Sequence, residues 1–346
     1  MRNLELKVLA FIAHCAFHIP HCESAAGRQE AASEVLLNMK VIEDVRKTEE
    51  RFPHVVLTAG SFDGVHLGHQ RVLHELTRRA RQAKGTAAVM TMRPHPREFF
   101  APGHAPNLLT SDRKKLELLA QMGIDVVFIL PFTEEVARLG PAVYVETIVD
   151  QRCHAKEMVI GHDFRFGREA QGDYALLCEI GSKLGFSVSQ VPPLMLDGER
   201  VSSTAIRERL FEGDIEEAER FLGRKYSILG EVVAGRGIGV SLGFPTANIR
   251  PHHTAIPAQG VYAAEVLIGK ERYPAAVNIG IAPTIRHDDV VIEAFILGFD
   301  RGIRGCEIEV VFHKRLRPEK KFSSHDELIA AIRHDVEAVT AHFSGF

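Results

Sequence analysis

The sequence predicts an α/β domain on a doubly wound parallel sheet, followed by a small antiparallel β-barrel with a C-terminal helix. Three observations support this prediction. Short apolar runs such as 126–130 alternate with amphipathic segments up to about residue 222, as in parallel sheets covered on both faces. The later runs are alternating and are separated by turns rich in Gly and Pro, as in small barrels. With 346 residues, the chain can form two hydrophobic cores.

In the first half, β-branched and apolar runs predict strands, and apolar residues at helical spacing predict helices. The helix after the first strand is indicated by Val72, Leu73, Leu76 and Ala80. Ser111 or Asp112 is expected to cap another helix, because short polar side chains accept first-turn N–H groups. The expected strands are 55–57, 86–91, 126–130, 158–160 and 186–191, and the further helices are 112–121, 142–150, 173–184 and one or two over 208–224.

In the second half, short β-rich runs predict the strands of the barrel. A single helix is expected at the end, with Ser324 and Glu327 fitting a capping box loosely. The expected strands are 226–233, 261–267, 273–277, 291–299 and 307–312, and the closing helix is 324–342.

Composition excludes several classes of protein. The formal net charge of −3, with both signs mixed along the chain, gives no electrostatic footprint for nucleic acid. Charges interrupt every apolar run well before the length of about 20 residues that spans a membrane. Five scattered cysteines without a Cys-x-x-Cys pair do not indicate a disulfide framework. We expect a reduced, cytoplasmic enzyme, and the sequence does not predict its oligomeric state.

Residues 1–38 do not fit the rest of the chain. The apolar stretch near Val8 resembles a poor signal peptide, and a cluster from His14 to Cys22 has the residue types of a metal site. We favour a third interpretation, an extension upstream of the folded chain with little order of its own.

Residues 58–70 carry the strongest motif, since they join an apolar strand to an amphipathic helix. His66 and His69 stand at the start of that helix, with Gly60 and Gly64 in the preceding turn. A helix N-terminus attracts phosphate through its N–H groups and dipole. Two imidazoles there can donate to a triphosphate and to the charge that develops as it is cleaved. The alternative is a surface turn that happens to hold two histidines.

Three more polar motifs follow expected strands, at the sheet edge where ligands bind. They are 94–96 with His95, 161–167 with Asp163, and 201–207. The last one places hydroxyls at a helix start with Arg207 one turn further on, which suits the phosphates of a nucleotide. Each motif also has a structural alternative, a turn residue for His95 and a helix N-cap for Asp163 and for the hydroxyl run.

The second half contains the motif 242–248. Thr246 and Asn248 are two residues apart, so both face one way on an extended segment, and their oxygens suit Mg²⁺. The alternative is a Thr/Asn pair in a turn. Glu293 lies within an apolar strand and is expected either at the barrel rim or as a general base.

Together these motifs resemble, in order, those of the bacterial bifunctional riboflavin kinase/FMN adenylyltransferases, the prokaryotic FAD synthetases. The resemblance runs from about Met39 to the C-terminus. It implies an FMN adenylyltransferase domain over 39–222 and a riboflavin kinase domain over 223–346. It further implies that the chain converts riboflavin and ATP to FMN, then FMN and ATP to FAD and pyrophosphate, with Mg²⁺ in both steps.

The resemblance also implies roles for particular residues. Asp163, Phe164 and Phe166 would receive the flavin, although either phenylalanine can instead be core. Glu293 would accept the proton of the ribityl 5′-hydroxyl. The full set comprises the catalytic residues His66, His69 and Glu293; the nucleotide-binding residues Gly60, Phe62, Asp63, Gly64, Ser202, Ser203, Thr204 and Arg207; the flavin-binding residues His95, Asp163, Phe164 and Phe166; and the Mg²⁺ ligands Thr246 and Asn248.

The kinase half departs from the family pattern at several positions. Ile238 and Val240 stand where the family often has arginines, and Phe295 stands where a histidine is common. Arg304 lies in a segment that usually resembles Asp-Leu-Tyr-Gly. An FMN adenylyltransferase with an impaired kinase half therefore stays open as an alternative. A flavin- or nucleotide-binding sensor without turnover and another nucleotidyltransferase are more distant alternatives.

Overall fold

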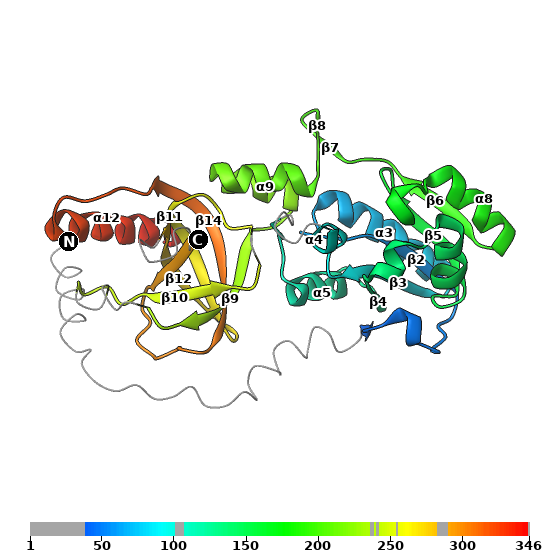
Figure 1. The fold of residues 1–346 in the computed structure, drawn as a ribbon. Helices are drawn as coiled ribbons and strands as arrows, with labels where there is room; N and C mark the ends of the chain where they lie inside the picture. Colours follow the sequence, from blue (N-terminus) through cyan, green and yellow to red (C-terminus); the bar gives the residue numbers. More distant parts are fainter. Residues whose placement is uncertain are drawn as a thin grey trace. The chain divides into compact units, whose positions relative to one another are not determined.

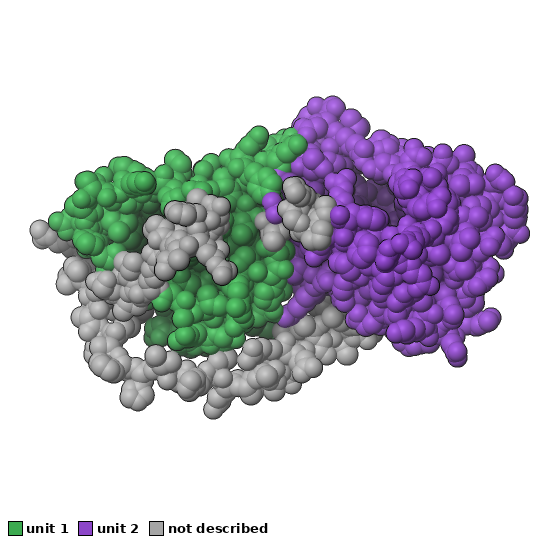
Figure 2. All heavy atoms as spheres, viewed as in Figure 1, with its two compact units in different colours: residues 1–31, 208–220, 224–346 green, residues 32–207, 221–223 purple. Residues whose placement is uncertain are grey.

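The computed structural model describes residues 39–100, 107–235, 239, 242–253, 255–281 and 290–344 (Figure 1). The expectations for residues 1–38 and the departures at Ile238 and Val240 lie outside these residues. Contacts divide the chain into two compact units (Figure 2). The described residues of Ala32–Arg207 and Phe221–Gly223 form one, here called the α/β unit, and those of Glu208–Arg220 and Arg224–Phe346 form the other, the barrel unit. The domain boundary expected at residue 222 remains a prediction.

The α/β unit is built on a six-stranded sheet of order β1-β4-β3-β2-β5-β6, in which every pair is parallel. The strands predicted in this half are all present, and a short edge strand, β1, had not been predicted. The strands are β1 (Lys40–Ile42), β2 (Val55–Ala59), β3 (Thr86–Arg93), β4 (Val126–Pro131), β5 (Ala155–Gly161) and β6 (Ser187–Val191).

Both faces of this sheet are buried, which explains why its strands are apolar throughout. Val55 and Leu57 enter one core with Tyr144 and Leu177, whereas Val56 enters the other with Leu73. Helices therefore cover both faces, as the doubly wound prediction required. The α-helices of this part are α3 (Leu67–Gln82), α4 (Pro96–Phe100), α5 (Asp112–Gln121), α6 (Glu134–Ala137), α7 (Pro141–Tyr144) and α8 (Tyr174–Leu184).

Local details agree with the expected capping and differ in one helix. The Ser111 side chain accepts from the backbone N–H of Lys114 and so caps α5. The helix expected over 142–150 instead has two parts, α7 and a π-helical turn, η2 (Val145–Asp150). Smaller elements are the 3-10 turns η1 (Val45–Lys47) and η3 (Arg168–Ala170) and the hairpin β7 (Met195–Leu196) and β8 (Glu199–Arg200).

Strand order places the polar motifs beside each other. β2 pairs with β3 on one side and with β5 on the other, so the chain changes its winding direction at β2. Ligands of open α/β sheets bind at the carboxyl ends of strands at such a switch point. The segments after β2 and β5 contain the motifs with His66 and Asp163, and they meet at this edge.

The barrel unit contains a closed antiparallel barrel of order β10-β13-β12-β11-β14-β9. Its helix α12 packs against β11 and β12, where Val339 contacts Ala263 and Ala276 (Figure 1). The sequence had missed β10. The elements are α9 (Ser203–Glu212), which begins in the other unit, α10 (Ile215–Leu222), β9 (Ser227–Val233), β10 (Ala247–Pro251), β11 (Gly260–Ile268), β12 (Glu271–Ile281), β13 (Val290–Ile296), β14 (Glu307–Pro318) and α12 (His325–Phe343).

Candidate active sites

The turn between β2 and α3 holds two histidines in a fixed arrangement. Nδ1 of His66 accepts from the backbone N–H of His69 at 3.3 Å and so caps α3. A neutral His66 ring therefore carries its proton on Nε2. The two rings stack with centroids 3.7 Å apart, and Phe62 lies 5.1 Å from the His69 ring. This arrangement restricts both imidazoles at the positive end of a helix.

The backbone of this turn is strained. Phe62 and Val65 adopt positive φ angles of 48° and 40°, which β-branched and bulky residues rarely adopt. The amide nitrogen of the Gln70 side chain donates to the carbonyl of Val65 and to that of Leu222, both at 2.9 Å. Strain that surrounding contacts maintain is frequent where a site must hold a fixed geometry.

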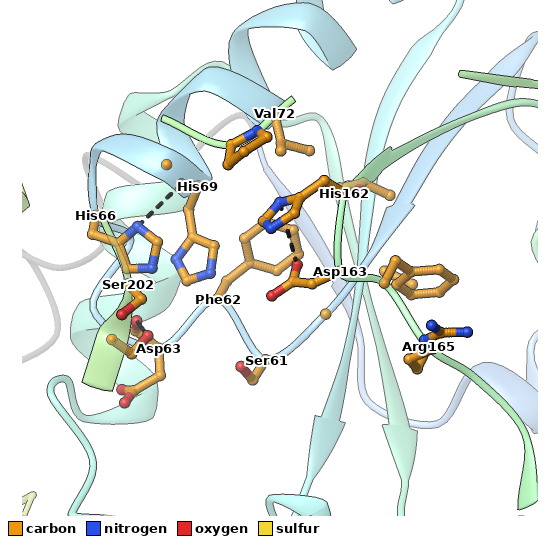
Figure 3. A pocket seen from close by; sticks show the side chains of 18 of the residues that line it. Ser61, Phe62, Asp63, His66, His69, Val72, His162, Asp163, Arg165 and Ser202 are labelled. Atoms are coloured by element: carbon orange, nitrogen blue, oxygen red, sulfur yellow. Dashed lines mark hydrogen bonds and ion pairs between the residues drawn. The ribbon is translucent and has the colours of Figure 1, made fainter. Parts of the chain in front are cut away.

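A cavity of about 680 Å³ opens beside the two histidines, a volume typical of small-molecule sites (Figure 3). Every site residue predicted for the first domain lines it except Gly64. Those residues are Gly60, Phe62, Asp63, His66, His69, His95, Asp163, Phe164, Phe166, Ser202, Ser203, Thr204 and Arg207. Segments more than a hundred residues apart in the sequence thus contribute to one site.

One side of the cavity is aromatic. The rings of Phe164 and Phe166 stack with centroids 5.7 Å apart, and Phe166 lies 6.0 Å from the Tyr144 ring. Phe166 is buried in the core and Phe164 is half-buried, so one is mainly core while its neighbour faces the cavity. They do not share a strand face, because β5 ends at Gly161 before them.

The pKa values of Asp163 and His95, which line this cavity, are both shifted, for different reasons. Burial raises the pKa of Asp163, but the hydrogen bond and charge of Arg200 outweigh it and hold that pKa below its ordinary value. Burial lowers the pKa of His95, and the charge of Asp63 only partly opposes this effect. Asp163 is thus an anion paired with an arginine, and His95 favours its neutral form near pH 7.

The hydroxyl motif performs the structural role weighed as its alternative. Ser202 Oγ accepts from the backbone N–H of Ala205 at 3.1 Å, as a helix cap does. Ser203 Oγ donates to the carbonyl of Asp63 at 3.0 Å, and Thr204 is exposed. Such a cap does not exclude a ligand, because the helix start still presents N–H groups to the cavity.

Sequence reasoning missed several residues that line the cavity, among them Tyr144, His162, Arg165 and Arg200. Tyr144 is buried, and its hydroxyl has no hydrogen-bond partner within the described part of the chain. Arg200 comes from the β7–β8 hairpin, while His162 and Arg165 flank the predicted Asp163 and Phe164 (Figure 3). No motif marks Tyr144 or Arg200. His162 and Arg165 lay inside the recognised motif 161–167 but were not singled out as site residues.

The barrel brings the predicted kinase residues together by strand pairing. Asn248 on β10 pairs in register with Glu293 on β13. Ile292 and Ala294 are fully buried and Glu293 is half-buried, so the carboxylate is on the opposite face of β13 from them. It lies within the strand and not at its end, which argues against a rim position.

Glycines leave room around Thr246 and Asn248. A Cβ on Gly235 would lie 2.0 Å from Nδ2 of Asn248, and one on Gly239 would lie 3.3 Å from Oγ1 of Thr246. Both glycines therefore let the backbone approach these side chains closely, and neutral hydroxyl and amide oxygens are ligands that Mg²⁺ accepts. Phe295 packs edge-on against Phe244 with ring centroids 5.4 Å apart.

Comparison with known proteins gives consistent matches for both halves. The family model described as FAD synthetase matches residues 48–205, and the one described as riboflavin kinase matches residues 222–343. A bifunctional riboflavin kinase/FMN adenylyltransferase of Haemophilus influenzae is 38% identical over 307 residues, which cover 88% of this chain and 100% of that protein. The Escherichia coli protein of that name is 38% identical over 291 residues, covering 84% of this chain and 93% of the relative.

A solved structure is similar over the same extent. The crystal structure titled macrolide-efflux protein from Streptococcus pneumoniae has a TM-score of 0.77 and 27% sequence identity, and the match covers 88% of this chain and 99% of that chain. Within the described residues of the present chain, no helix has the length and apolar character needed to cross a membrane.

Proposed function

The chain belongs to the family of bifunctional riboflavin kinases/FMN adenylyltransferases, and we propose that it phosphorylates riboflavin to FMN and adenylylates FMN to FAD. Two ATP molecules are consumed for each FAD. The observation that carries the proposal is the coverage of both halves by bifunctional relatives. It is supported by the single cavity that gathers the predicted nucleotide and flavin residues. Neither finding favours the alternative of an impaired kinase half.

In the adenylylation step, a phosphate oxygen of FMN attacks the α-phosphorus of ATP. The bond to the bridging oxygen breaks, and pyrophosphate leaves. Reactions of this kind depend mainly on positioning and on neutralising phosphate charge. His66 and His69 donate to the phosphate oxygens on which charge accumulates, and the first turn of α9 with Arg207 holds the triphosphate. Gly60 and Phe62 let the backbone approach the nucleotide.

The flavin occupies the aromatic side of the same cavity. Phe164 offers its ring to the isoalloxazine, supported from behind by Phe166. Asp163 and His95 provide polar contacts at the edge of the flavin. A neutral His95 donates a hydrogen bond there through Nε2, because its Nδ1 accepts from the backbone N–H of Arg97 at 3.2 Å.

In the kinase step, Glu293 accepts the proton of the riboflavin 5′-hydroxyl while that oxygen attacks the γ-phosphorus and ADP leaves. Thr246 and Asn248 would hold Mg²⁺, which would supply charge neutralisation at the ATP phosphates. Phe295 replaces an imidazole common in the family, so the kinase must neutralise charge without it. A cytoplasmic location remains a prediction from the sequence.

A product assay tests the proposal. Purified protein is incubated with ATP and MgCl₂ and with either riboflavin or FMN, and the flavins are separated by chromatography. We expect FAD from both substrates and no product when EDTA is in excess over magnesium. FAD from FMN alone would support the impaired-kinase alternative. No turnover by a folded sample, with both flavins still bound, would support a sensor.

A further inference from the structure

Asp63 lies beneath the nucleotide turn with its carboxylate almost completely enclosed by protein. The residue is 4% exposed. Its Oδ1 accepts from the backbone N–H groups of Leu109 and Thr110 at 2.9 and 3.2 Å, and its Oδ2 pairs with Nη2 of Arg207 at 2.5 Å. A carboxylate with these partners has little lone-pair capacity left for a ligand. It would also repel the phosphates of ATP.

The contacts of Asp63 connect three segments that line or support the cavity. The first is its own turn, which leads to His66. The second contains Leu109 and Thr110, and Oγ1 of Thr110 also accepts from the Gly64 N–H at 3.3 Å. The third is the start of α9, since Ser203 donates to the carbonyl of Asp63. Moving this side chain would break its contacts with the second segment and its ion pair with the third, whereas the contact of Ser203 with the Asp63 backbone carbonyl would remain.

Arg207 is the partner whose position depends most on Asp63. Its side chain is 15% exposed, its Nε donates to the carbonyl of Asn107 at 2.5 Å, and its Nη2 donates to Asp63. A guanidinium has five N–H donors in a fixed plane. The hydrogen bonds at Nε and Nη2 of Arg207 fix the guanidinium plane, and neither of them involves Nη1. The residue lines the cavity, so this orientation presents a preset cation to an anionic ligand.

We infer that Asp63 is a positioning residue of the adenylyltransferase site, which fixes the Arg207 guanidinium for the ATP triphosphate and does not itself bind the nucleotide. This inference rests on the proposed function and replaces the expectation that Asp63 contacts ATP. Its physical basis is preorganisation, because a cation held in place loses no freedom when the phosphates arrive. The strained backbone at Phe62 and Val65 belongs to the same assembly.

The variant Asp63→Asn tests this role. The amide keeps an oxygen for Leu109 and Thr110 but removes the charge that holds Arg207. We expect kcat/KM for ATP in FMN adenylylation to fall at least about 30-fold, mainly through KM, with KM for FMN changed by less than about 2-fold. Riboflavin phosphorylation by the same chain should not change, which shows that the barrel unit is folded, and the unchanged KM for FMN shows the same of the α/β unit.

Asp44→Asn is the matched control. Asp44 also accepts from an arginine, Arg46, and from its backbone N–H in the same unit, but it does not line the cavity. We expect both activities of this control to equal those of the unaltered protein. A merely structural role of Asp63 predicts a different result, namely equal rises in KM for ATP and FMN together with a lower melting temperature.

A double-mutant cycle with Arg207→Gln identifies the route of the effect. If Asp63 acts through Arg207, the double variant should lose no more activity than Arg207→Gln alone. Losses that multiply in the double variant would overturn the inference.

If Asp63→Asn does not fold, Arg207→Lys carries the test, because lysine keeps the positive charge but lacks the planar guanidinium with its paired N–H donors. We then expect KM for ATP to rise at least about 5-fold with KM for FMN unchanged, and an unchanged KM for ATP would overturn the inference. Absence of FAD formation by the unaltered protein would contradict the proposed function, whereas normal kinetics of Asp63→Asn in an active protein would contradict only this inference.

Discussion

Asn248 and Glu293 are register partners on the antiparallel strands β10 and β13, so their side chains lie on the same face of the barrel. On its other side, Glu293 pairs in register with Asn278 of β12. The carboxylate is therefore flanked by two amide side chains from neighbouring strands. This arrangement places a potential base beside the residue expected to hold Mg²⁺.

Glu293→Gln should slow FMN formation at least about 100-fold, the usual scale for the loss of a general base. The amide has the same shape and cannot accept the proton. FAD formation from FMN should stay normal, because the other site lies in the α/β unit. Steady-state rates with riboflavin and with FMN measure both effects. Glu231→Gln is the control, since Glu231 lies on β9 of the same barrel and pairs with Arg250. A near-normal rate of FMN formation by Glu293→Gln would remove Glu293 from this role.

His66→Ala should abolish FAD formation and spare FMN formation. The change removes an imidazole from the cavity and also the cap of α3, which costs about 1 kcal/mol of stability. His66→Asn separates the two effects, because asparagine caps helices well but lacks the imidazole. We expect it to restore the melting temperature without restoring FAD formation. His74→Ala on an exposed position of the same helix should behave like the unaltered protein. Equal loss of both activities in His66→Ala would contradict independent sites.

The sequence predicted the fold well because its strands and helices follow simple periodicities. The apolar run at 126–130 is typical of a strand buried on both faces, and Asp112–Gln121 was predicted with the bounds that α5 has. The elements missed were short. β1 has three residues, and β10 alternates Ile249 with polar neighbours inside a motif that drew attention to its chemistry.

Pairings between distant residues could not be predicted in this way. Periodicity does not reveal that Asp63 pairs with Arg207, which is 144 residues further on. It does not set the register that joins Asn248 to Glu293 either. A positive φ at Val65 runs against local preference, and only the tertiary contacts maintain it. Tyr144 and Arg200 were missed for a related reason, because the segments that hold them carry no motif.

Acid should destabilise the barrel unit through His253. The Tyr226 hydroxyl donates to the carbonyl of Ala255 and lies 2.9 Å from Nε2 of His253, which therefore carries the proton of the neutral ring. Nδ1 is buried and has no hydrogen-bond partner in the described part of the chain, so protonation there is unfavourable. Burial above all, with a smaller contribution from His252, lowers the pKa of His253 to about 4.

The direction of the pH effect follows from this lowered pKa. The unfolded chain binds a proton near pH 6.5 and the folded chain only near pH 4, so the stabilisation is complete above pH 6.5 and is lost as the pH falls towards 4. At pH 4.5 the loss amounts to about 2–3 kcal/mol. Urea unfolding at pH 7 and 4.5 measures it, with His253→Gln as the comparison. The stability advantage over that variant should shrink by this amount in acid, and an unchanged advantage would refute the assignment.

Gly64→Ala should impair FAD formation, although Gly64 does not line the cavity. Gly64 has a φ of +83°, and a Cβ there would lie 2.8 Å from Cδ1 of the fully buried Leu109. Gly185 has the same φ, and a Cβ there would meet nothing within 4 Å. Alanine at either position incurs about 1 kcal/mol of backbone strain, and at Gly64 the overpacking against Leu109 adds about 1–3 kcal/mol. The backbone N–H of Leu109 also donates to Asp63, so displacement of Leu109 would disturb the nucleotide site.

We therefore expect Gly64→Ala to lower FAD formation at least about 10-fold and to leave FMN formation unchanged. Both activities of Gly185→Ala should stay unchanged. Denaturant unfolding and the two product assays test this, and equal behaviour of the two variants would show that φ alone, and not the contact with Leu109, requires glycine in the turn.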